Sequence, residues 1–254
     1  MTRLITIPFS HYCEKARWVL DRNGVAYDEE RYMPTFHFPA AMRALVGRGK
    51  GLHDRASTRF STPILIGDGV LLTDSSEIVR HVEPRLFEDP EAQRLDAYFG
   101  DELGPHSRLI VYWHALKEPR LLFELADTNV SRQQALLFRR LYPIVATMVR
   151  TQLRIDEAAY RRSLERVRRI ADDVALRLAD GRPFLLGDRF SAADLAFAAL
   201  FAPAILPGCD VYGAKLPAPK RFPPEAQSFV REHRDHPAGR FAMRMFREER
   251  HRRT

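Results

Sequence analysis

Strand-like patterns occur only in the first third of this chain, and that uneven distribution limits its fold more than any other feature. Short apolar runs alternate with helical periodicity as far as residue 72, and from about residue 90 onward only helical patterns remain. Alternating strands and helices are typical of an α/β unit, whereas an unbroken helical series is typical of an all-α unit. For a chain of 254 residues we expect an α/β domain at 1–83, a linker at 84–90 and an all-α domain at 91–254.

The N-terminal part follows the order strand, helix, strand, helix, hairpin, helix. The sequence predicts strands at 4–7 and 25–32, helices at 10–23 and about 39–46, and a loop at 47–60. The segment Gly67-Asp68-Gly69 separates two short apolar runs and predicts a hairpin, because such a turn needs residues that tolerate positive φ. A further helix is expected to begin at Asp74.

The second part is expected to be helical throughout. Helices are predicted at roughly 90–116, 131–155, 157–179 and 191–202, followed by an irregular proline-rich segment at 203–224 and a final helix from about residue 225. Ser191 and Asp194 are spaced as an N-cap and its partner three residues later, and Phe190 and Leu195 occupy the flanking apolar positions. This motif predicts a helix start and carries no information about a substrate.

Charge and composition exclude several classes of protein. The chain has 40 basic and 33 acidic residues, and its arginine-rich segments at 150–169 and 240–253 are expected to be solvated, because acidic residues interrupt the first of them. We therefore expect no nucleic-acid partner. The apolar stretch 195–206 is far shorter than the ~20 residues of a membrane span, so no membrane association is expected.

Two cysteines indicate a reducing, cytoplasmic location, and the apolar patch at 1–9 is too short for an export signal. Local spacing of His and Cys assembles no metal site, so we expect no metal.

The segment 8–17 contains the most informative junction, where a strand ends and a helix begins. Free N–H groups and the helix dipole favour a negative charge at this position, and the hydroxyl of Ser10 can donate a further hydrogen bond. Such a site would stabilise a thiolate. By residue type alone, Ser10 could also be an ordinary helix N-cap, and Cys13 could be a small buried residue of the apolar core. Both interpretations stay open at this point.

Four motifs in this order resemble the glutathione transferase family, and the resemblance covers nearly the whole chain. They are Ser10-x-x-Cys13, which has the spacing of a C-x-x-C motif whose first cysteine is replaced, then Thr62-Pro63, Asp74-Ser75-Ser76-Glu77-Ile78 and the capping motif at Ser191 and Asp194. The resemblance implies an N-terminal thioredoxin-like domain that binds glutathione. It also implies an all-α domain that completes a pocket for a second, electrophilic substrate.

The resemblance also implies roles for individual residues. Ser10 would donate a hydrogen bond to the glutathione sulfur, Thr62 would pair through its backbone with the cysteinyl part before a cis Pro63, and Asp74 and Ser75 would hold the γ-glutamyl group. Asp74 or Ser75 equally suits a plain helix cap, and a proline is tolerated at a strand start regardless. The basic residue that would meet the glycyl carboxylate has three candidates, Lys50, Arg55 and Arg59.

The expected function is therefore conjugation of the glutathione thiolate to a small hydrophobic electrophile, or its use in isomerisation or dehalogenation. Because serine replaces the first cysteine of the C-x-x-C pattern, dithiol exchange lacks its nucleophile. Cys13 could therefore act at most as a single, unpaired thiol. Tyr112 and Trp113 are candidate pocket walls, although a place in the packed core is favoured for either residue. The resemblance implies a homodimer formed between unlike domains of the two chains. The alternative function is a protein of the same fold that binds or assembles without turnover.

Overall fold

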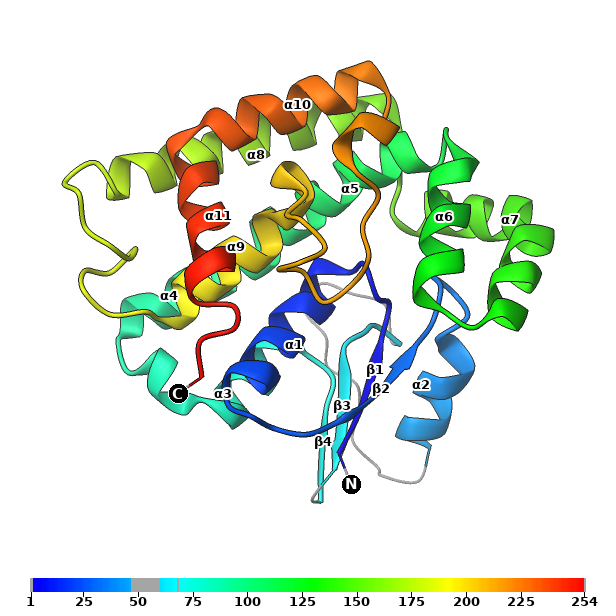
Figure 1. The fold of residues 1–254 in the computed structure, drawn as a ribbon, viewed down its shortest axis with the longest axis horizontal. Coiled ribbons are helices and arrows are strands. Elements are labelled where there is room, and N and C mark those ends of the chain that lie inside the picture. The colour runs from blue at the N-terminus through cyan, green and yellow to red at the C-terminus, as the bar shows by residue number, and fades with distance from the viewer. Residues whose placement is uncertain (1, 47–59, 68, 254) are drawn as a thin grey trace.

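The N-terminal part of the protein is built on one small sheet. The computed structural model describes residues 2–46, 60–67 and 69–253. Its strands are β1 (Arg3–Thr6), β2 (Asp28–Arg31), β3 (Ile64–Gly67) and β4 (Val70–Leu72), in the order β2-β1-β3-β4 (Figure 1). Strand β1 is parallel to β2 and antiparallel to β3, and β3 and β4 form the expected hairpin with Gly69 at φ 82°. The expected loop lies, for residues 47–59, outside the described residues.

Three helices cover the two faces of this sheet. They are α1 (His11–Arg22), α2 (Phe38–Leu45) and α3 (Ser75–Val82). Leu4 and Leu65 pack into the apolar cluster that contains α1 and α3, whereas Ile5 and Ile64 pack with Ala40 and Ala41 of α2. Because neighbouring strand residues point to opposite faces, α1 and α3 cover one face and α2 covers the other.

The second part contains helices alone among its described residues, apart from one isolated β-bridge between Phe184 and Gly187. The α-helices are α4 (Pro90–Tyr98), α5 (Gly104–Ala115), α6 (Pro119–Asn129), α7 (Arg132–Gln152), α8 (Glu157–Arg177), α9 (Ala192–Ile205), α10 (Pro224–Asp235) and α11 (Pro237–Glu248). Helix α9 is almost wholly buried and packs against α1, α4, α5, α10 and α11. This architecture confirms the expected fold class, a thioredoxin-like α/β part followed by an all-α part (Figure 1).

Several helix boundaries differ from the sequence predictions. The single helix expected at 90–116 is interrupted by a π-helical segment, Phe99–Leu103. The hydroxyl of Tyr12 donates to the carbonyl oxygen of Gly100 (2.9 Å), and a Cβ on Gly104 would lie 2.1 Å from that hydroxyl oxygen. Close contact with a residue of α1 therefore accompanies the irregular turn, and no local pattern reveals it.

Other helices also differ from the sequence predictions. Helix α6 was not predicted, and the final helix is two helices, α10 and α11, with His236 between them. Helix α9 continues past Pro203 to Ile205. Pro84–Phe87 and Pro219–Arg221, both expected to be irregular, are short 3₁₀ helices.

No described helix is both long and apolar enough to cross a lipid bilayer.

The C-terminal arginines are not all solvated, which corrects the expectation for that segment. Arg250 is 1% exposed, and its Nε donates to Oε1 of Glu14 in α1 (2.7 Å) while its guanidinium also pairs with Asp21 (2.8 Å). The sequence shows only a run of basic residues there, and the partners lie more than 220 positions away. The arginines of α8 are exposed or half-buried, as expected.

The predicted capping motif is confirmed at the start of α9. One carboxylate oxygen of Asp194 accepts from the backbone N–H of Ser191 (2.8 Å) and from its hydroxyl (2.6 Å), and the other accepts from the N–H of Leu185 (2.7 Å). Asp194 is fully buried. Removing its carboxylate would leave two buried N–H groups without partners.

We predict that Asp194→Ala lowers the free energy of unfolding by about 2–4 kcal/mol, because each buried unpaired donor costs about 1–3 kcal/mol. Urea unfolding followed by circular dichroism measures this change. Asp188→Ala, at an exposed position six residues earlier, is the matched control and should change the stability by less than about 0.5 kcal/mol. Equal stability of the two variants would contradict the role given to Asp194.

Candidate functional site

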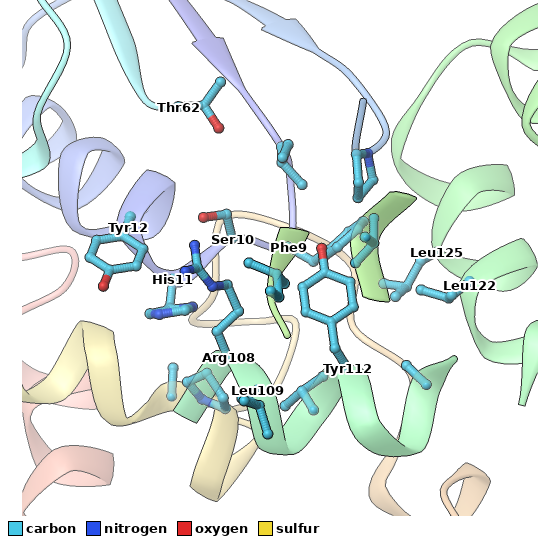
Figure 2. Close-up of a pocket in the computed structure, with 18 of the residues that line it drawn as sticks. Phe9, Ser10, His11, Tyr12, Thr62, Arg108, Leu109, Tyr112, Leu122 and Leu125 are labelled. Atoms are coloured by element: carbon cyan, nitrogen blue, oxygen red, sulfur yellow. The ribbon is translucent and has the colours of Figure 1, made fainter. Parts of the chain in front are cut away.

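A cavity of about 380 Å³ lies where the N-terminal part meets the helices of the second part (Figure 2). The segment between β1 and α1 contributes Phe9, Ser10 and His11 to its lining, and Thr62 comes from the residue pair before β3. Helices α5 and α6 supply most of the opposite wall, which includes Arg108, Leu109, Tyr112, Leu122 and Leu125. The cavity therefore combines hydroxyl groups from one part of the chain with an apolar wall from the other.

Ser10 occupies the N-cap position of α1, as the sequence predicts. Its backbone is extended (φ −71°, ψ 126°), and its N–H donates to the carbonyl oxygen of Ile7 (2.9 Å). The side chain makes no capping hydrogen bond to α1, so its hydroxyl is not used to close the helix end. Ser10 is half-buried and faces the cavity (Figure 2).

Thr62 and Cys13 lie next to Ser10. The side chains of Ser10 and Thr62 both act to lower the pKa of the Cys13 thiol, so the structure brings these three predicted residues close together. Cys13 is fully buried, and this burial raises the pKa of its thiol despite the charge of Arg17 and the two hydroxyls. A buried thiol with a raised pKa is a poor nucleophile. Cys13 therefore fits the role of a small buried apolar residue better than that of a single reactive thiol.

The Thr62–Pro63 peptide bond is cis, as the family resemblance implies. Pro63 is buried and directly precedes β3. Thr62 is half-buried and lines the cavity, so its backbone and its hydroxyl lie at the edge of the site. A sequence can place a proline before a strand, but it does not specify the isomer of the bond.

Asp74 and Ser75 lie at the N-terminus of α3 and do not line the cavity. The Asp74 carboxylate accepts from the N–H groups of Ser76 (2.7 Å) and Glu77 (3.0 Å), which is the capping arrangement weighed as an alternative role. Ser75 is 3% exposed. The basic candidates Lys50, Arg55 and Arg59 lie outside the described residues.

The structure adds functional residues that sequence patterns did not reveal. His11 is buried, and its ring N–H at Nε2 donates to the carbonyl oxygen of Gly104 (3.0 Å). Burial and the nearby charge of Arg108 lower the pKa of His11 to about 3, so the ring is neutral. Arg108 extends from α5 toward Ser10 and His11 (Figure 2). Only the tertiary contact between α1 and α5 identifies either residue.

Of the two predicted wall residues, the structure places one in the cavity. Tyr112 lines it, and burial raises the pKa of its hydroxyl to about 12. Trp113 is not among the lining residues and instead stacks on Tyr160 with ring centroids 4.9 Å apart. Among the described residues no group of three or more His, Cys, Asp or Glu could hold a metal ion. The described site can therefore donate hydrogen bonds and bury an apolar molecule.

Comparisons with known proteins agree with this geometry. The family model of the glutathione S-transferase N-terminal domain matches residues 9–85, and that of the glutathione S-transferase C-terminal domain matches residues 157–224. A comparison with curated proteins found no match.

Solved structures of this kind resemble the chain over nearly its whole length. Glutathione transferase F2 from Populus trichocarpa is 13% identical, with a TM-score of 0.54 and coverage of 97% of this chain and 99% of that one. A theta class enzyme from Xanthomonas axonopodis pv. citri with glutathione bound is 18% identical, with a TM-score of 0.51 and coverage of 95% and 96%. One from Ceriporiopsis subvermispora in complex with glutathione is 17% identical, with a TM-score of 0.53 and coverage of 98% and 97%.

The burial of Cys13 predicts different reactivities for the two cysteines. Cys209 is exposed, so one thiol should react rapidly with an aromatic disulfide reagent in the native protein and a second only after denaturation. Cys209→Ser is the control and should remove the rapid reaction completely. Rapid labelling that persists in this variant would show that Cys13 is accessible and would restore it as a candidate thiol nucleophile.

Proposed function

Because the chain belongs to the glutathione S-transferase family, we propose that it is a glutathione transferase that joins the glutathione sulfur to a small apolar electrophile. The single observation that best supports this is the shared cavity, in which Ser10 and Thr62 face the apolar side chains of α5 and α6. In this proposal residues 1–83 hold glutathione and the helices of residues 91–254 supply the electrophile pocket. The two free cysteines suit a reducing cytoplasm.

Ser10 is proposed to stabilise the reacting thiolate. Its hydroxyl would donate a hydrogen bond to the glutathione sulfur, and the N-terminus of α1 adds a favourable partial positive charge. A free thiol has a pKa of about 8.5, so lowering it by about two units makes the thiolate the main species at neutral pH. The sulfur then forms a bond to the electrophilic atom, and the leaving group departs with its electron pair.

Glutathione itself is proposed to lie at the end of the sheet where β3 begins. The backbone of Thr62, which lines the cavity, would pair with the cysteinyl part. The N-terminus of α3, with Asp74 and Ser75, would receive the γ-glutamyl group, because the positive end of the helix dipole favours its carboxylate and an aspartate can pair with its ammonium.

The apolar wall is proposed to bind and orient the second substrate. Phe9 lies beside Ser10, and Leu109, Leu122 and Leu125 lie farther from Thr62 (Figure 2). Burial of an apolar molecule against these side chains is favourable by roughly 25 cal/mol for each Å² removed from water. Holding the electrophile beside a preformed thiolate converts a bimolecular reaction into an effectively unimolecular one within the complex.

We predict that Ser10→Ala lowers kcat/KM with a chloronitrobenzene electrophile by about 100-fold, because one donor to the developing thiolate is lost. Ser10→Thr keeps the hydroxyl and should retain most of the activity. Calorimetry should show that the alanine variant still binds glutathione, since Thr62 and α3 remain. Glutathione binding without any activity in the parent, or activity unaffected by Ser10→Ala, would favour the alternative of a non-catalytic binding protein.

A homodimer is the proposed assembly, and an exposed apolar stripe on α7 supports it. Leu137, Ile144 and Met148 are 48%, 60% and 39% exposed. Together with the half-buried Leu141 they follow the spacing 4, 3, 4 along the helix, which places them on one face. Exposed apolar patches of this kind mark protein contact sites, and α7 lies at the outer edge of the molecule (Figure 1).

We predict that the parent protein sediments at twice the mass of one chain. The double variant Leu137→Glu/Ile144→Glu should sediment at the mass of one chain, because charges cannot be buried unpaired in the contact. Leu176→Glu is the matched control, since Leu176 is 74% exposed on α8 and outside the stripe. A monomeric parent would contradict the proposed assembly, and a dimeric double variant would exclude this stripe as its contact.

A further inference from the structure

The cavity contains a positive charge, that of Arg108, for which the described residues supply no counter-charge. Arg108 is half-buried on α5, and its Nε is shielded from solvent without a hydrogen-bond partner. Among the described residues Arg108 takes part in no ion pair, and its Cζ lies 5.9 Å from the centre of the Tyr12 ring. The buried cations elsewhere are paired, as Arg17 with Glu14 (2.9 Å) and Arg250 with Glu14 (2.7 Å) illustrate.

The other lining residues that the structure describes offer this charge no partner. The described lining residues include no aspartate or glutamate, and they include a second cation, the exposed Arg154 just after α7. One titratable neighbour, His11, is neutral because burial and the charge of Arg108 lower its pKa to about 3. The hydroxyl of Tyr112 is also neutral, since burial raises its pKa to about 12. The described part of the cavity is thus apolar and positively charged.

This combination discriminates between ligands. A neutral apolar molecule that filled the cavity would remove water from the guanidinium and give it no hydrogen bonds in return, which is unfavourable. An anionic substituent would replace that water with charge-assisted hydrogen bonds, and a planar carboxylate matches the two-pronged geometry of an arginine. The apolar wall would bind the body of the same molecule.

We propose that the second substrate carries an anionic group, a carboxylate or an oxyanion of similar geometry, on an apolar body, and that Arg108 binds this group. The proposal rests on the proposed glutathione transferase function and specifies the substrate class of that site. The glutathione thiolate is the other anion that Arg108 would reach, since the side chain points toward Ser10 (Figure 2). The experiment below therefore uses thioethers, which carry no thiolate.

The test compares two conjugates that differ only in one charge, S-(4-carboxybenzyl)glutathione and S-(4-carbamoylbenzyl)glutathione. Calorimetry should show the parent binding the carboxylate about 10–100-fold more tightly than the amide, the range expected for a hydrogen-bonded charge pair. Arg108→Gln should abolish this preference by weakening carboxylate binding alone, and Arg108→Lys should restore part of it. Arg169→Gln removes one exposed charge from α8 and should leave both affinities unchanged.

Each other outcome overturns the proposal in a distinct way. Equal affinity of the parent for both conjugates rejects an anionic substrate and leaves the glutathione transferase function standing. Binding of neither conjugate and of no glutathione rejects both. An Arg108→Gln variant that weakens both conjugates equally has lost packing rather than an anion site. If that variant instead raises the pKa of bound glutathione and keeps the carboxylate preference, Arg108 serves the thiolate.

Discussion

Buried ion pairs between α1 and the helical part fix the position of the junction between β1 and α1. Glu14, Lys15 and Arg22 of α1 are each at most 7% exposed, and they pair with Arg250 (2.7 Å), Asp96 and Glu249 (2.8 Å) respectively. Removing one partner from such a pair costs about 3–5 kcal/mol, because the other charge stays buried and unpaired. These pairs allow few relative positions of α1 and the helices, so Ser10 at the start of α1 is held facing α5.

The loop that carries the site is tied from both sides. The guanidinium of Arg17 donates to the carbonyl oxygen of Pro8 (2.6 Å). The hydroxyl of Tyr212 donates to the carbonyl oxygen of Phe9 (3.3 Å). His11 donates to the carbonyl oxygen of Gly104, the first residue of α5. Because these bonds come from three separate segments, the backbone on both sides of Ser10 is held in place before any ligand arrives, and a preorganised donor stabilises a developing charge most effectively.

Local patterns predicted the parts of this protein that local interactions determine. The order of strands and helices in the first part, the Ser10 junction and the capping motif at Ser191 and Asp194 each follow from residues within a few positions of one another. Arg108 could not be predicted, because the role proposed for it depends on a cavity built from distant segments, whose described lining residues include no acidic side chain. The same holds for the π-helical segment before α5, where the contact with Tyr12 crosses from the other part of the chain.

The central claim is that Ser10 lowers the pKa of the glutathione thiol within this cavity. The most direct test is the ultraviolet absorbance of the thiolate of bound glutathione, titrated against pH in the parent and in Ser10→Ala. A thiol pKa about two units below the free value of about 8.5 in the parent, returning toward that value in the variant, is the result we predict. An unshifted pKa in the parent, or the same depressed value in both proteins, would contradict the account.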